Sequence, residues 1–218
     1  MRKILVTATV LLLLAFPGLA AADTSLGLRG GTLGGGAELS YALSQRAAVR
    51  LNADGYTRKQ TSTQADIDYD MKLKLQTASL LGDLFPFANN FRVSLGAMFN
   101  GNKFSLKGQP TGPGYVINGN PYGAAEVGSL EAAVKFRKAS PYFGIGYGRP
   151  IKSGLSLIFD AGIMFQGSPR SKIDVNCGTT ARCAQLQSDA KAEESSLDDS
   201  LHKFKYYPVI SLGLAYTF

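Results

Sequence analysis

The C-terminal segment 206–218 most constrains the fold, because large apolar residues and small residues alternate along it. Successive side chains of a β-strand point to opposite faces, so this segment predicts a strand with one apolar face. That face consists of Ile210, Leu212, Leu214, Tyr216 and Phe218, and Tyr206 adds an aromatic ring at its other end. An apolar band with aromatic residues at both edges is typical of a strand that crosses a bilayer. A strand of a soluble sandwich can alternate in the same way, so the other segments are needed to separate the two folds.

The first 22 residues predict a secretory signal peptide. A basic start precedes an apolar run over 4–16 that is too short to span a bilayer comfortably, and small residues precede Asp23. We expect cleavage after Ala22, which leaves 23–218 as one domain. Cleavage removes Arg2 and Lys3, so the formal net charge falls from +7 to +5. The remaining charge is spread out and predicts no binding of nucleic acid.

Alternation of apolar and polar residues recurs along the chain and predicts eight strands. The phase changes around Lys138–Pro141, which predicts a bulge there. The polar stretch 58–70 is either a loop or the wet upper part of a hairpin. The predicted strands are 25–31, 33–43, 47–56, 71–84, 91–107, 127–148, 155–166 and 206–218.

Short connections at 44–46, 87–90 and 149–154 alternate with longer ones at 57–70, 108–126 and 167–205. No apolar run after residue 22 is long enough for a transmembrane helix, and only a closed barrel crosses a bilayer without helices. Outer membrane barrels keep their short turns and both termini in the periplasm. The sequence therefore predicts an all-β fold, an eight-stranded antiparallel transmembrane β-barrel in the outer membrane of a Gram-negative bacterium.

Two of the long connections carry local signals. Within 108–126, the segment 115–122 predicts a small hairpin because of its Asn-Gly-Asn-Pro centre. Within 167–205, strong helix formers and leucines spaced by four predict a short amphipathic helix over 184–204. We expect both loops on the outer side, where exposed Tyr115, Ile117 and Tyr122 could contact a surface ligand.

The last three predicted strands resemble eight-stranded outer membrane proteins, which include the membrane domain of outer membrane protein A and the opacity and Ail-type barrels. The resemblance rests on Ser-Pro-Tyr-Phe-Gly-Ile-Gly-Tyr-Gly at 140–148 and on the final Tyr-Thr-Phe. In those proteins, a terminal phenylalanine with apolar residues at alternate positions is the signal for the barrel-assembly machinery. The resemblance implies this role for Leu212, Leu214, Tyr216 and Phe218, with that machinery and the outer membrane lipids as partners. It implies no single function, because such barrels include adhesins, channels, lipid enzymes and structural anchors.

Charged residues at inward positions predict what fills the barrel. Eight strands leave an interior just wide enough for side chains, and buried charges must be paired. We therefore expect a packed ionic plug and a structural or surface-interaction role. The alternative is a narrow channel for small solutes or apolar molecules. The predicted lumen charges are Arg29, Glu38, Arg50, Asp54, Lys72, Lys74, Arg92 and Asp160.

Cys177 and Cys183 lie close together, and in an oxidising compartment they predict a local disulfide. The single histidine, His202, falls within the predicted helix, where we interpret it as a solvated or packed residue. With no metal-ligand set and no catalytic set, the sequence predicts a protein that is not an enzyme and holds no cofactor. We also expect the barrel to be a monomer. A lipid-modifying enzyme that uses His202 is the least favoured alternative.

Overall fold

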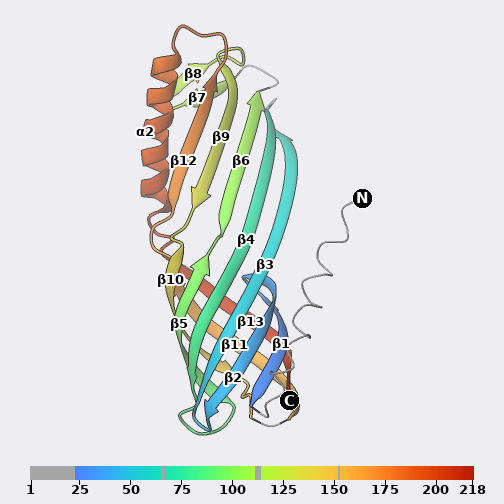
Figure 1. Ribbon diagram of the computed structural model, residues 1–218. Coiled ribbons are helices and arrows are strands. Elements are labelled where there is room, and N and C mark those ends of the chain that lie inside the picture. Colours follow the sequence, from blue (N-terminus) through green and yellow to red (C-terminus); the bar gives the residue numbers. More distant parts are fainter. Residues whose placement is uncertain (1–22, 65–66, 111–113, 152) are drawn as a thin grey trace.

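The computed structural model describes residues 23–64, 67–110, 114–151 and 153–218, which form a closed barrel with an extension at one end (Figure 1). Eight antiparallel strands make the ring, and β1 closes it by pairing with β13, with Leu28 opposite Leu214. The predicted barrel is therefore confirmed. In ring order, the strands are β1 (Thr24–Gly31), β2 (Gly34–Ser44), β3 (Ala47–Gln64), β4 (Ile67–Leu84), β5 (Phe91–Asn100), β10 (Ala139–Tyr147), β11 (Gly154–Phe165) and β13 (Tyr206–Thr217).

The predicted signal peptide, 1–22, lies outside the described residues, so its cleavage stays a prediction. Within the described ranges, no helix is long and apolar enough to cross a membrane.

Large apolar side chains point outward all around the ring, as the alternation predicts. On β13, Ile210, Leu212 and Leu214 are each more than half exposed, while Ser211 between them is buried. Aromatic rings mark both edges of this apolar band. Tyr216 and Phe218 meet edge to face at 5.4 Å at the end with the short turns, and Phe165 and Tyr206 do so at 5.5 Å at the other end. The barrel thus presents an apolar belt between two aromatic rims.

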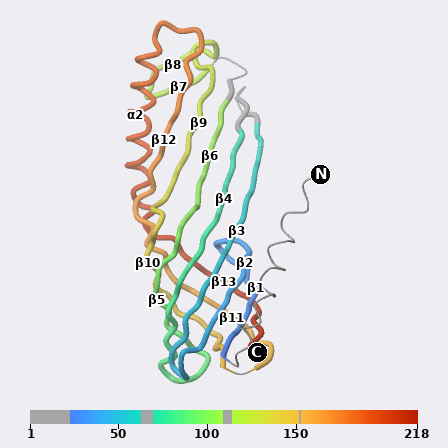
Figure 2. Tube along the Cα trace, viewed as in Figure 1, coloured from blue at the N-terminus to red at the C-terminus, as the bar shows by residue number. Residues whose placement is uncertain are grey.

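The extension is an open sheet that grows out of the barrel wall. β3 and β4 have 18 residues each and pair without interruption from Ala47 opposite Leu84 to Gln64 opposite Ile67. Figure 2 shows both strands passing straight from the barrel into the extension. The polar stretch 58–70 is therefore the upper part of a hairpin and not a loop. β6 (Lys103–Pro110) adds to β4, β9 (Val127–Lys135) adds to β6, and β12 (Arg170–Cys177) adds to β9.

Two of the predicted strands are each divided where the sheet leaves the barrel. The predicted strand 91–107 is β5 and β6, separated at Gly101 and Asn102. The main chain of Gln76 on β4 binds the two residues at this break. Its carbonyl accepts from the Gly101 N–H at 2.8 Å, and its N–H donates to Asn102 Oδ1 at 2.9 Å. The predicted strand 127–148 is β9 and β10, interrupted at 136–138, next to the predicted bulge.

A helix lies along the extension beside β12, and a small hairpin lies at the far end of the extension (Figure 1). The hairpin of β7 (Tyr115–Ile117) and β8 (Asn120–Tyr122) is confirmed, and α2 (Cys183–Leu201) lies within three residues of the helix predicted over 184–204. Strand β12 is absent from the predicted strands, because 167–205 is expected to be a loop with a helix. Its inward side chains, Ser171, Ile173 and Val175, alternate with exposed polar ones, and α2 packs on it.

Candidate functional site

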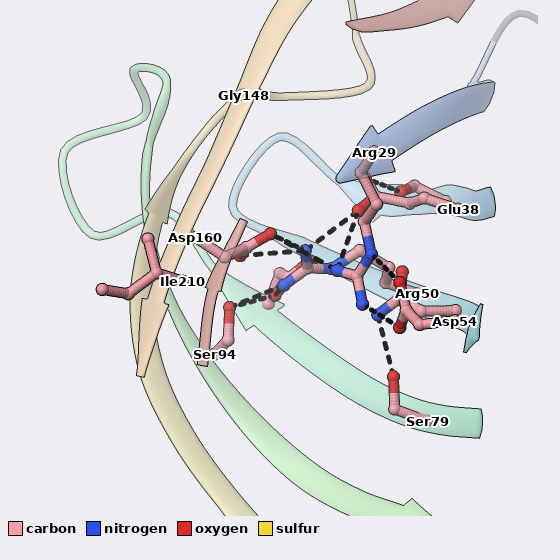
Figure 3. A network of polar contacts seen from close by, with 12 residues as sticks. Arg29, Glu38, Arg50, Asp54, Ser79, Ser94, Gly148, Asp160 and Ile210 are labelled. Atoms are coloured by element: carbon pink, nitrogen blue, oxygen red, sulfur yellow. Dashed lines mark hydrogen bonds and ion pairs between the residues drawn. The ribbon is translucent and has the colours of Figure 1, made fainter. Parts of the chain in front are cut away.

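Three arginines and four carboxylates meet inside the barrel (Figure 3). They come from six strands of the ring, and each residue is at most 8% exposed. Buried charges are tolerated when they are paired and hydrogen-bonded, which is the arrangement here. These seven residues and Ser94, which Arg50 also binds, are called the lumen network. The seven are Arg29, Glu38, Arg50, Asp54, Asp83, Arg92 and Asp160.

Arg50 on β3 is the centre of the lumen network. Its Nη1 donates to Glu38 Oε2 at 3.1 Å and to Asp160 Oδ2 at 2.8 Å, and its Nη2 donates to Asp83 Oδ1 at 3.0 Å and to Ser94 Oγ at 3.0 Å. Strands β3 and β11 stand four places apart in the ring of eight. The ion pair between Arg50 and Asp160 therefore joins opposite walls of the barrel.

The other two arginines complete the network on either side. Arg29 binds Asp54 with two bonds, Nε to Oδ1 at 2.9 Å and Nη2 to Oδ2 at 2.6 Å. Arg92 binds both oxygens of Asp160 at 3.0 Å through Nη2 and donates through Nη1 to the Gly148 carbonyl at 2.9 Å. Two-bond contacts between guanidinium and carboxylate fix geometry as well as charge. Asp160 is therefore paired with three arginines from different strands, Arg50 and Arg92 in hydrogen-bond contact and Arg29 at 3.6 Å.

Gly146 on β10 provides the space for this pair. It stands opposite Asp160 in the β10–β11 register. A Cβ at this position would lie 2.8 Å from Arg92 Nε and 2.8 Å from Asp160 Oδ1. No side chain larger than hydrogen fits unless the ion pair moves.

An apolar cluster fills the barrel on the extension side of the lumen network. Its members are no more than 3% exposed, and Tyr207 packs against them. On β11, Met164 lies beyond Asp160 in the direction of the extension and faces the same side of the strand. The lumen is therefore occupied by side chains at two successive levels. This lumen cluster consists of Leu33, Leu81, Met98, Tyr142, Met164 and Val209.

Six of the eight predicted lumen charges lie in the lumen, but the prediction for Lys72 and Lys74 is wrong. Both lysines are exposed on the part of β4 that pairs with β6 beyond the barrel. The apolar residues of β4 change face along the strand: Leu80 and Leu84 point outward in the barrel, whereas Leu73 lies on the opposite face. If the alternation around Leu73 is continued into the barrel, the inward and outward faces of β4 are interchanged.

Asp83 is missing from the predicted lumen charges for the same reason. It alternates with the outward Leu84 and faces inward. Alternation referred to Leu80 and Leu84 predicts this inward position. The alternation along the predicted strand 33–43 places Leu33 on the outward side with Leu39 and Leu43, but the structure buries Leu33 in the lumen cluster. It lies in the tight connection between β1 and β2, where strand alternation does not determine direction.

Two carboxylates of α2 hold the hairpin, and Glu193 Oε2 accepts from the Asn118 backbone N–H at 3.1 Å. Asp189 on α2 accepts hydrogen bonds from Tyr122 Oη at 2.5 Å, Asn120 Nδ2 at 2.8 Å and Asn118 Nδ2 at 3.2 Å. These three bonds, that from Tyr122 first, lower the pKa of Asp189. The expectation that Ile117 and Tyr122 are exposed is wrong, because both are buried against α2 in a cluster with Val127, Leu186 and Ala190.

The disulfide between Cys177 and Cys183 is present, as predicted, and links the end of β12 to the start of α2. Beside it, Arg182 binds both oxygens of Glu126, at 2.7 and 2.8 Å. This pair, with a bond from the Gly123 N–H, lowers the pKa of Glu126. The two links fix α2 on the sheet through its first turn.

No catalytic or metal-binding set is found in the part of the chain that the structure describes. His202 follows α2 and is exposed, and its Nδ1 lies 3.4 Å from Ser168 Oγ. A nucleophilic serine needs its base oriented by a third group, and among the described residues no carboxylate is bonded to this imidazole. The same residues contain no group of three possible metal ligands of the His, Cys, Asp and Glu type.

No protein-family model matches the chain, and no curated protein matches it. Among solved structures, CarO2 of Acinetobacter baumannii is similar, with a TM-score of 0.56 and 18% identity over 90% of this chain and 98% of that one. CarO of Acinetobacter baumannii gives a TM-score of 0.55 and 18% identity over the same shares. A major outer membrane protein from Thermus thermophilus gives a TM-score of 0.45 and 14% identity over 91% and 100%. The two likenesses to CarO proteins are likenesses of fold.

Proposed function

We propose that this protein is a non-conducting outer membrane barrel that presents its extension at the cell surface. The closed ring leaves no strand edge within the apolar belt, and lipid admits only closed barrels or helices. The outward leucines between two aromatic rims fit the hydrocarbon layer and its two interfaces. The terminal Leu212, Leu214, Tyr216 and Phe218 lie in the closing strand, the position of the assembly signal in the barrels that the sequence resembles.

The observation that carries the non-conducting part is the ion pair across the lumen. Arg50 contacts Asp160 from the opposite wall and Glu38 and Asp83 from its neighbours, so its guanidinium occupies the middle of the barrel. Each member of the network is buried and paired, so moving Arg50 out of the lumen would leave Glu38, Asp83 and Asp160 as uncompensated buried charges, which is strongly unfavourable. On the extension side of the network, the lumen cluster fills the barrel with mainly apolar side chains, which do not solvate an ion.

The extension supports a structural or surface-interaction role. It is a five-stranded sheet stabilised by a helix, a hairpin and a disulfide, and it lies at the end of the barrel opposite the C-terminus (Figure 1). Ordered elements beyond a barrel rim are where binding residues are placed in proteins of this shape. The chemistry of the described residues favours binding over catalysis, because Ser168 and His202 lack an orienting acid.

Solute efflux from proteoliposomes tests the proposal. We expect vesicles with the folded protein to retain a small dye and a small sugar as protein-free vesicles do. The variant Arg50→Ala/Tyr142→Ala, which truncates both levels of the lumen, should release them, whereas Leu51→Ala on the outer face should not. Efflux through the unmodified protein would contradict the proposal and favour a narrow channel for small solutes.

A further inference from the structure

Four cations stand side by side across the base of the extension. Lys74 on β4 is directly opposite Lys103 on β6, Lys103 is opposite Lys135 on β9, and Lys135 is opposite Arg170 on β12. Lys103 and Arg170 are the first residues of their strands, and Lys135 is the last of its own. We call these four residues the cation row.

The cation row has no internal counter-charge. In the described part of the chain, none of its members forms an ion pair with a carboxylate. Lys59 and Lys72 stand opposite each other one level further from the barrel, which adds two more cations. The acids of this face lie further out, where two of them are ion-paired with Lys107 and Lys172. Like charges directly opposite on neighbouring strands destabilise a sheet, so an anion that bridges them is favoured.

The cation row lies on the open face of the extension. Ser171 and Ile173 point toward α2, since Ser171 Oγ donates to Asp198 Oδ1 at 2.6 Å and Ile173 lies in the cluster beneath the helix. Arg170 and Lys172 alternate with them and therefore face the other way. A groove of about 680 Å³ runs along this open face. Lys103 and Lys135 of the cation row line it, and so do Lys72, Lys172 and the more distant acids Asp70, Glu131 and Asp174.

This open face continues the apolar belt of the barrel. On β4, Lys74 lies on the same side as Ala78 and Leu80, and Ala78 is opposite the exposed Phe99 of the aromatic rim. Four residues of strand separate Lys74 from Ala78, a distance of about 13 Å along the strand. In a bilayer, the aromatic rim lies at the interface with the lipid headgroups, and the cation row lies on the water side of that rim.

We propose that the cation row binds the phosphate groups of the glycolipid in the outer leaflet. The inference rests on the proposed placement in the outer membrane. A headgroup that carries more than one phosphate can contact more than one of the four cations, which are spaced about 5 Å apart on neighbouring strands. Lysine serves phosphate as a point charge, and arginine can bind it with two bonds. A lipid seated here has its acyl chains along the outward leucines directly below.

The test is binding of diphosphoryl lipid A to the folded protein in detergent, measured by native mass spectrometry. The test variant replaces Lys74, Lys103, Lys135 and Arg170 with glutamine. The matched control replaces Arg58, Lys191, Lys203 and Lys205 with glutamine, which removes the same charge elsewhere. We expect the test variant to bind at least about thirtyfold more weakly, since each cation near an anionic surface contributes to affinity, and the control to bind as the unmodified protein does.

Two comparisons identify the ligand. Lipid A without phosphates should bind weakly to every variant, and inorganic phosphate at millimolar concentration should not displace diphosphoryl lipid A. Equal binding by the test variant and the control, equal binding of the dephosphorylated lipid, or displacement by inorganic phosphate would each overturn the inference. A protein that fails to fold into detergent or vesicles, as judged by heat-dependent gel migration, would instead overturn the proposed membrane placement.

Discussion

Replacing Arg50 with methionine tests how much the lumen network stabilises the barrel. Methionine keeps most of the buried volume but leaves Glu38, Asp83 and Asp160 without the cation that they share. Removing one partner of a buried ion pair costs about 3–5 kcal/mol, because the remaining charge stays buried. With a urea dependence of about 2 kcal/mol per molar, the unfolding midpoint should fall by roughly 2 M.

Urea unfolding in lipid vesicles, followed by far-UV circular dichroism, measures this shift. The control is Arg58→Met, which removes an exposed arginine from the same strand beyond the barrel. A surface substitution of this kind should change stability by less than about 0.5 kcal/mol. If Arg50→Met and Arg58→Met unfolded at the same urea concentration, the lumen network would not stabilise the barrel as proposed.

A second substitution separates loss of the ion pair from loss of packing. In the described structure, Arg50 is the only cation paired with Asp83, and Ser94 is its other partner. Asp83→Asn should therefore be less harmful, by about 0.5–3 kcal/mol, when Arg50 is already methionine. Equal effects in both backgrounds would mean that the cost arises from volume and not from charge.

Three further outcomes follow from the structure. Gly146→Val should prevent folding or lower the unfolding midpoint more than Gly30→Val does, because a Cβ at Gly146 meets the ion pair and one at Gly30 meets nothing within 4 Å; equal midpoints would contradict this. Leu212→Arg should slow insertion into vesicles, since an arginine facing lipid at midplane costs about 2–4 kcal/mol, and normal insertion would show the face assignment to be wrong. The lowered pKa of Asp189 means that its contribution is complete above the pKa of a free carboxyl, about 4, and is lost as the pH falls through the lower folded value. The protection factors of the β7–β8 amides against hydrogen exchange, taken relative to the intrinsic rate at each pH, should therefore fall below about pH 4, and Asp189→Asn should weaken this dependence; protection that does not change with pH would contradict the assignment.

The ring of eight strands could be predicted because period-two alternation is a local property. Leu212 and Leu214 point outward in the structure as their spacing implies, and the same holds for Leu95 and Leu157 on other strands. Inward charges such as Arg92 and Asp160 followed from the same alternation. Most strands of the ring carry enough large outward apolar residues to fix their phase, but β4 also has a leucine on its inward face, Leu81.

The extension was less predictable because its apolar face is not fixed by lipid. On β4 the apolar side changes from Leu80 in the barrel to Leu73 beyond it, without any bulge in the pairing with β3. The outer segment turns its apolar side in the direction of α2 and exposes lysines on the other. One uninterrupted strand therefore carries two opposite patterns, and a single phase cannot describe both.

The contacts inside the lumen could not be predicted from alternation alone. Alternation indicates that Arg50 and Asp160 both point inward, but not that they meet at the same level. They are 110 residues apart in the sequence, and their distance depends on strand stagger around the whole ring. Closure of the ring is what brings the two side chains together.

Electrical recording across a planar bilayer tests the closed lumen most directly. We expect no conductance steps from the folded, inserted protein, and reproducible steps from Arg50→Ala/Tyr142→Ala at the same protein concentration. Insertion of both proteins would be verified by heat-dependent gel migration of the recovered membrane. Reproducible steps from the unmodified protein would contradict a closed lumen, because the pair of Arg50 and Asp160 spans the barrel and blocks a continuous path along its axis.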